Sequence, residues 1–156
     1  MSLLSFGAPS WAEPPNIWAF TQEPDGDAKL GITSPGSNTY GLVLFQCRPG
    51  SKLVRMLIDI ADGDLAGAAN AIRRQDRIPV TLAAGGEQTA VIPDLVYNNH
   101  DSLWWYAAEV EFLDPLIAGL KRSGRLTVGG PGARYDYSGE GIGRAMPAFM
   151  AACAGT

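Results

Sequence analysis

The chain has 156 residues, of which 46% are apolar and 18% charged, and this balance is typical of one compact domain with a buried core. Its formal net charge is −4 and its basic residues are scattered, so we expect no nucleic-acid partner and no anionic lipid partner. No apolar run approaches the roughly 18 residues of a membrane-spanning helix. The 19 glycines and 11 prolines favour many turns and short strands.

The N-terminal segment has features of a targeting sequence. A short apolar run precedes Ser10 and Ala12, which place small residues at the third and first positions before a cleavage site at Glu13. A positively charged start is missing, so an ordinary flexible leader is the alternative. We predict that residues 1–12 are a signal-peptide remnant or leader, and that residues 13–156 form a single β-rich domain. The signal-peptide interpretation predicts a periplasmic or secreted protein.

Antiparallel strands follow in chain order. The turn signals "PDGD" and "SPGS" separate short apolar runs. Residues 52–60 alternate apolar and polar side chains with a period of two, which indicates a strand with one buried face. Residues 40–47 are expected to pair with it through the hairpin turn "RPGS". Cys47 would then end a strand.

The middle of the chain predicts one helix and three strands. Residues 62–74 place apolar side chains at helical spacing. Residues 77–99 indicate a strand, a turn at Gly85 and Gly86, and a second strand, while residues 102–112 alternate as another strand.

The C-terminal third predicts two helices around a strand pair. Residues 114–124 have an Asp cap, a proline in the first turn and a terminal glycine. "RLTVGG" and "ARYDYS" indicate two short strands. The fold class we expect is therefore mainly β, a sandwich or barrel-like antiparallel meander, with two or three short helices including a C-terminal one.

The segment "GEGIGR" at residues 139–144 superficially matches a dinucleotide loop. Arg144 stands where a third glycine is required, and too few residues follow for a βαβ unit, so we expect no nucleotide cofactor. A helix with one apolar stripe ending at Cys153 is the better interpretation. Pro147 interrupts the stripe, so the helix either begins just before it or is kinked there.

Aromatic residues supply the candidate binding surface. Trp104 and Trp105 are adjacent on a strand and must point to opposite faces, so one of them needs a cover. The cover could be an inserted helix, the segment that carries Trp18, or a partner protein. The full candidate surface comprises Trp104, Trp105, Tyr106, His100, Arg134 and Tyr135.

The residues predict no metal site and no catalytic constellation. His100 is the only histidine, and it lacks companion ligands for zinc, so a solvated turn residue is the main interpretation. A small hydrolase that uses His100 with Asp101 and Glu109 is the enzymatic alternative. Glu109 and Glu111 otherwise form the solvent face of their strand. No catalytic residue is assigned.

The two cysteines, Cys47 and Cys153, are too few for a disulfide-dense miniprotein. In an oxidising compartment they would pair with each other. The alternative is that each is a small buried apolar residue. A catalytic cysteine has no supporting motif.

The order "GLVLFQC", "KLVRMLIDI", "IPVTLAAGG", "DPLIAGLKRSGRLTV" and "YDYSGEGIGRAMPAFMAAC" resembles small exported bacterial proteins. These are the VasI-like proteins associated with type VI secretion and the related invasion-associated locus B proteins. The resemblance implies a periplasmic β-sandwich-like domain in which Cys47 bonds Cys153, and it brings no catalytic residues. The Ala-rich residues 61–76 and the Trp-Trp-Tyr strand depart from it.

Together these features favour an exported protein that acts by binding a protein partner in the cell envelope, as an accessory to envelope or secretion machinery. A second interpretation is a periplasmic inhibitor of a wall-degrading hydrolase. It rests on the faint likeness of "GARYDYSGEG" to the loop of lysozyme-inhibitor proteins, although the spacing after the tyrosine differs.

Overall fold

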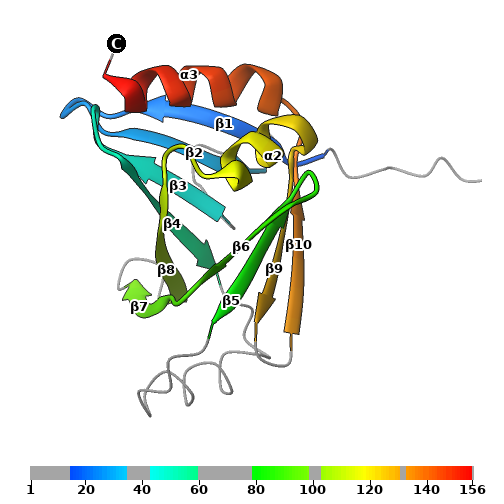
Figure 1. Ribbon diagram of the computed structural model, residues 1–156. Helices are drawn as coiled ribbons and strands as arrows, with labels where there is room; N and C mark the ends of the chain where they lie inside the picture. Colours follow the sequence, from blue (N-terminus) through cyan, green and yellow to red (C-terminus); the bar gives the residue numbers. More distant parts are fainter. Residues whose placement is uncertain (1–14, 35–42, 60–78, 99–102, 131–132, 156) are drawn as a thin grey trace, which may run out of the picture.

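The computed structural model confirms the predicted fold class, since its described residues are mainly β and form two antiparallel sheets and two helices (Figure 1). One sheet has six strands in the order β1-β2-β3-β4-β8-β7, and the other has four in the order β10-β9-β5-β6. The structure describes residues 15–34, 43–59, 79–98, 103–130 and 133–155. The leader and the helix predicted over residues 62–74 lie outside them.

The bounds of the strands and helices are β1 Ile17–Gln22, β2 Ala28–Thr33, β3 Val43–Cys47, β4 Leu53–Asp59, β5 Val80–Ala84, β6 Glu87–Val91, β7 Asp94–Asn98, β8 Leu103–Glu111, α2 Pro115–Ser123, β9 Arg125–Gly130, β10 Ala133–Ser138 and α3 Ile142–Ala154.

The β3–β4 hairpin forms as predicted. The Ser51 amide donates to the Arg48 carbonyl at 2.9 Å and closes the turn. On β4 the side chains of Val54, Met56 and Ile58 are buried, with at most 1% of their surface exposed, and the residues between them face away from the core. The alternation therefore turns one face of this strand pair toward the interior.

The stretch from Glu87 to Asn98, predicted as one strand, is two strands in different sheets, so this prediction is wrong. β6 pairs with β5 and ends at Val91, and β7 begins at Asp94 and pairs with β8. Pro93 lies between them, where it can donate no ladder hydrogen bond and its ring fixes φ. The chain therefore leaves one sheet at this proline and joins the other.

Glu140 links the β10 edge of the smaller sheet to the β1 edge of the larger sheet. The Trp18 amide donates to the Glu140 carbonyl at 2.7 Å, and the Glu140 amide donates to the Asn16 carbonyl at 2.9 Å. Glu140 thus forms a short parallel bridge to β1, two residues after β10 ends. The extension of β10 continues the smaller sheet onto the edge of the larger one.

Helix α2 begins and ends as the sequence predicts. The Asp114 carboxylate accepts from the Leu116 amide at 2.8 Å, and Gly124 terminates the helix in the left-handed conformation at φ 62°. The helix packs closely on the turn between β5 and β6, because a side chain at Gly119 would collide with the Ala84 carbonyl.

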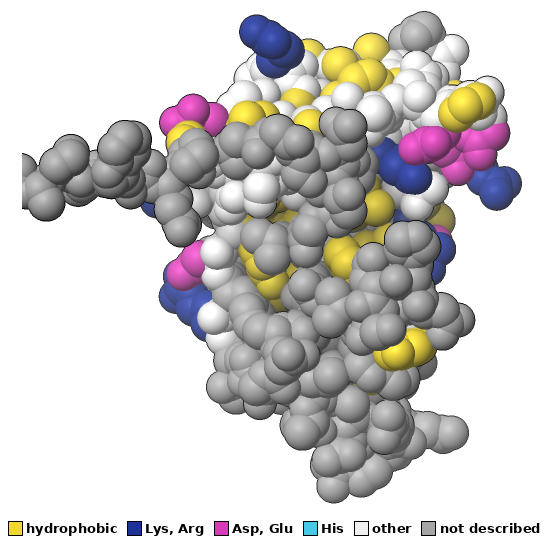
Figure 2. Space-filling view, turned by 180° about the vertical axis from the view of Figure 1, so that it is seen from behind, with side chains coloured by type: hydrophobic (Ala, Val, Ile, Leu, Met, Phe, Trp, Pro, Cys, Tyr) yellow, Lys and Arg dark blue, Asp and Glu magenta, His cyan; other side chains and the backbone are white. Residues whose placement is uncertain are grey.

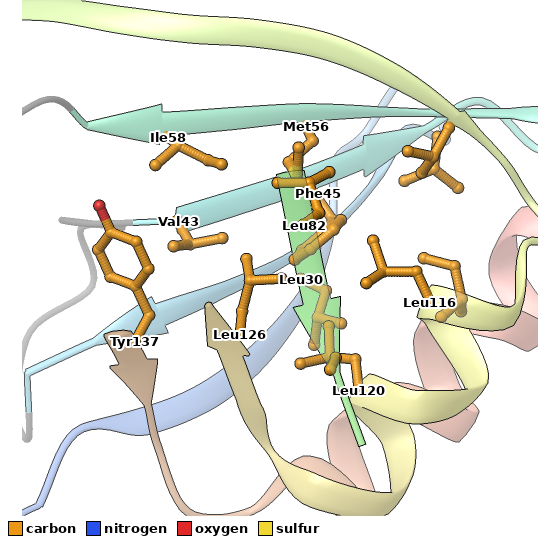
Figure 3. Packing of buried hydrophobic residues seen from close by; sticks show 14 of the residues in the cluster. Leu30, Val43, Phe45, Met56, Ile58, Leu82, Leu116, Leu120, Leu126 and Tyr137 are labelled. Atoms are coloured by element: carbon orange, nitrogen blue, oxygen red, sulfur yellow. The ribbon is translucent and has the colours of Figure 1, made fainter. Parts of the chain in front are cut away.

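The core fills the space between the sheets and beneath the helices. Figure 3 shows Leu30 and Phe45 of the larger sheet facing Leu82 and Leu126 of the smaller one, with Leu116 of α2 beside them. All five side chains are completely buried. The helices therefore cover one end of an interior that both sheets line (Figure 1).

Helix α3 carries the predicted apolar stripe and the predicted disulfide. Met146, Phe149 and Cys153 are fully buried, and Cys153 is bonded to Cys47 with a Cα–Cα distance of 5.7 Å. The helix begins at Ile142, five residues before Pro147, so it does not start at the proline as one interpretation expected. Pro147 is exposed and sits within the second turn.

Candidate functional site

Trp105 and Tyr106 point to opposite faces of β8, as the predicted alternation requires, and both rings are buried. Tyr106 faces the core with 5% of its surface exposed, and Trp105 lies on the opposite face of the sheet with 7% exposed. The Trp105 indole N–H finds no acceptor among the described residues. Trp104 occupies its strand position opposite Tyr97, while its side chain lies outside the described set.

The Trp18 ring does not cover Trp105, while residues 1–14 of the segment that carries Trp18 lie outside the described part of the chain. The Trp18 ring lies on the core side, 6.3 Å from the Phe45 ring, and its indole N–H donates to the Gly124 carbonyl at 2.9 Å. The burial of Trp105 within a single chain nevertheless means that the chain itself covers it.

The other candidate residues belong to a different sheet or lie outside the described part. Arg134 is exposed on β10 and forms an ion pair with Asp136 at 3.6 Å. Tyr135 pairs with Val128 across the ladder. His100 lies outside the described residues. The described members of the predicted surface therefore divide between β8 and β10, and binding by this surface stays a prediction.

An apolar groove of about 750 Å³ runs between β1 and α3. One wall is made by residues 17–20 of β1, and the other by Gly141, Arg144, Ala145 and Ala148 at the start and along one side of α3. A volume of this size is within the range of ligand-binding clefts. In Figure 2 apolar side chains gather at the top of the molecule, the end where Figure 1 places β1 and α3.

Local geometry explains why the groove is open. Gly141 has a φ of 84°, in the left-handed region that glycine tolerates best, and there the chain turns from the edge of β1 into α3. A side chain at Gly139 would lie 3.1 Å from the Trp18 ring, so the chain also passes close to β1 before this turn. The glycines thus let the backbone touch β1 and then leave it.

Both ends of the α3 wall are fixed to the sheet. Glu140 holds the N-terminal end through its two hydrogen bonds to β1. At the other end, Cys153 is bonded to Cys47, and its carbonyl accepts from the Gly50 amide at 2.7 Å. The position of α3 beside β1 is therefore fixed by contacts at both ends of the helix.

Two polar hollows occupy the face of the six-stranded sheet that points away from the core. They have volumes of about 330 and 460 Å³ and share Arg55 and Glu109, which are cross-strand partners on β4 and β8. Near them Gln46 donates to the Asp27 carboxylate at 3.4 Å. Charges of both signs line these hollows, so they select no single charge type.

Sequence reasoning missed the groove, although two signals were present. The strand "IWAFTQ" contains no charged residue, and small residues occupy the flank of α3 at Ala145 and Ala148. What the sequence does not disclose is that these two segments lie side by side, since they are separated by more than a hundred residues.

Within the described ranges, no group of three or more histidine, cysteine, aspartate or glutamate side chains is arranged to hold a metal ion. The described helices include none with the length and apolar character needed to cross a bilayer. Comparisons with protein-family models, with curated proteins and with solved structures found no match to this chain. The similarity to VasI-like and invasion-associated proteins therefore stays a prediction.

Proposed function

We propose that this chain is an exported binding protein that works in an oxidising compartment of the cell envelope by holding a protein partner. The disulfide supports the compartment, because structural disulfides persist in the periplasm and outside the cell and are rare in reducing cytosol. Both sulfur-bearing residues are buried, Cys153 completely and Cys47 to 96%, as expected for a structural bond.

The single observation that carries a binding role is the preformed groove between β1 and α3. Its walls are mainly apolar, and α3 is held at both ends by covalent and hydrogen bonds. A binding surface that is already ordered loses little conformational entropy on association. This arrangement suits recognition of a partner in a fixed geometry.

The resemblance in sequence order gives the proposed role its context. The proteins that this chain resembles are exported, and the VasI-like ones are associated with type VI secretion. We extend that role to this chain as part of the proposal.

The test combines localisation with site-directed cross-linking of the full chain. A photoreactive phenylalanine replaces Ala148 in the groove, and a matched variant carries it at Ala118, an exposed position of α2. We expect the protein in the extracytoplasmic fraction with its cysteines oxidised, and a discrete cross-link to an envelope protein only from position 148. A cytoplasmic protein with free thiols, or the same cross-links from both positions, would contradict the proposal.

A further inference from the structure

We infer that the free edge of β1 accepts an extended, uncharged segment of the partner protein as an added strand, seated between β1 and α3. This inference rests on the proposed function for the existence of a protein partner. It adds the mode of recognition and the chemistry of the segment that is recognised.

The hydrogen-bonding pattern of β1 carries the first step. Because the Trp18 amide and the Asn16 carbonyl both bond Glu140, the even-numbered backbone groups of this strand point away from β2. Phe20 and Gln22 follow with the same two-residue period, so their N–H groups point to the same open edge. No described residue bonds the backbone of Phe20 on that side.

Glu140 shows that this edge can hold a second backbone. It pairs with β1 in the parallel sense at Ile17, and the chain then turns away at Gly141. Beyond Glu140, the space along the free edge of β1 is open on one side and bordered by α3 on the other. An extended segment would lie in this space and continue, along β1, the backbone hydrogen bonding that Glu140 makes at its start.

The charge distribution distinguishes β1 from the other edge strands of the described sheets. β10 carries Arg134 and Asp136, β6 begins with Glu87 and β7 with Asp94. Charged residues on an edge discourage pairing with other chains. β1 has none, so it lacks the protection that the other three edges have.

The lining of the groove selects the chemistry of the segment. It contains one anion and one cation, Glu140 and Arg144, and its other lining residues are apolar or glycine. The walls therefore carry no net formal charge and favour an uncharged strand with apolar side chains. Recognition of this kind takes affinity from main-chain hydrogen bonds and specificity from alternate side chains.

A second copy of this chain fits the edge less well. Two β1 strands related by a twofold axis would run antiparallel, and Glu140 of each copy already occupies the edge beside Trp18. Only the short stretch from Phe20 to Gln22 would remain for pairing. A separate segment can enter from the open end without this conflict.

The probe for the test is a capped, fluorescent peptide of alternating valine and threonine, about eight residues long. Two further peptides are N-methylated, one on its valine amides and the other on its threonine amides. Since alternate amides of a strand point to opposite edges, each methylated peptide has one blocked edge. We expect the unmodified peptide to bind saturably. One methylated peptide should bind with the same affinity, and the other should bind at least tenfold more weakly.

Protein variants and amide exchange locate the bound peptide. Ala148→Glu places a charge in the groove and should weaken binding at least tenfold, whereas Ala118→Glu places the same charge on exposed α2 and should leave it unchanged. Matching melting temperatures would show that both variants fold. Saturating peptide should slow hydrogen exchange at the Phe20 and Gln22 amides.

Several outcomes would overturn the inference. The first three are failure of the peptide to bind, equal affinity of the two methylated peptides, and unchanged hydrogen exchange at the Phe20 amide. Decanoate, a fatty acid without backbone amides, serves as a control ligand, and its binding in place of the peptide would also contradict the inference. A dimer of this chain that Ala148→Glu disrupts would do the same. The titration uses the purified full chain and does not depend on its cellular compartment. Its failure is therefore distinguishable from failure of the proposed function, which localisation tests.

Discussion

Breaking the bond between Cys47 and Cys153 should remove a large part of the stability of the fold. The two cysteines are 106 residues apart in the sequence. In the chain-entropy relation, closing a loop of this length lowers the entropy of the unfolded chain by about 16 cal/mol/K, or about 4.8 kcal/mol at 25 °C. The whole free energy of unfolding of a domain is commonly about 5–15 kcal/mol, so this single bond is a major contribution.

Urea denaturation of the oxidised and the reduced wild-type protein measures this contribution. Both forms keep the two sulfur atoms, so the difference reports the cross-link without the cavity that a Cys→Ala change would leave in the core. We expect the free energy of unfolding to fall by about 4.8 kcal/mol on reduction. In a separate thermal denaturation the melting temperature should fall by roughly 10–20 °C, from about 2–4 °C for each kcal/mol in a chain of this size.

The double variant Cys47→Ala with Cys153→Ala provides the second comparison. It should be less stable than the reduced wild type, because Cys153 is fully buried and its truncation also removes packing. Equal unfolding midpoints for the oxidised and reduced proteins would refute the chain-entropy argument. Two free thiols in the denatured, unreduced protein would refute the bond itself.

Four further changes probe the contacts that hold the helices, each read by urea denaturation. Trp18→Phe should cost about 1–3 kcal/mol, because it truncates a buried ring and leaves the Gly124 carbonyl with only the 3.3 Å hydrogen bond from the Gly139 amide, and a loss below about 0.5 kcal/mol would contradict this. Gly119→Ala should destabilise by about 1–3 kcal/mol through collision with Ala84, whereas Gly143→Ala, with open space around it, should stabilise by up to about 1 kcal/mol; a gain from both would exclude the collision. Asp114→Ala should cost about 1–2 kcal/mol, since Asp114 caps α2 and accepts from Thr89 at 2.9 Å, and unchanged stability would rule out the cap.

Local patterns predicted much of the fold because their causes are local. The alternation on β4, the Asp114 cap and the Gly124 terminator depend on side chains close together in the sequence. The division of residues 87–98 between two sheets was missed, although Pro93 is a local signal for it. A proline between two apolar runs shows that the ladder is interrupted, but it does not show which strand each run pairs with.

The groove could not be predicted for a different reason. It depends on Glu140 meeting β1 and on the Trp18 indole reaching Gly124, which are contacts between the two ends of the chain. In the sequence, the glycines at 139 and 141 stand out only as a superficial match to a dinucleotide loop. In the structure Gly139 lets the backbone pass close to β1, and Gly141 makes a left-handed turn into α3. Both requirements come from the position of β1, which the local sequence does not reveal.

The disulfide and the groove depend on the same helix, and this connects stability with binding. Cys153 lies near the C-terminal end of α3, while Arg144, Ala145 and Ala148 line the groove nearer its N-terminal end. Because the bond to Cys47 holds the far end of this helix, we expect oxidation to restrict the motion of the wall against which the proposed partner would pack. A reduced chain would have to order that wall during binding, at a cost in free energy that the oxidised chain has already met in folding. The oxidising compartment that we propose for this protein would therefore also favour the proposed binding in the groove.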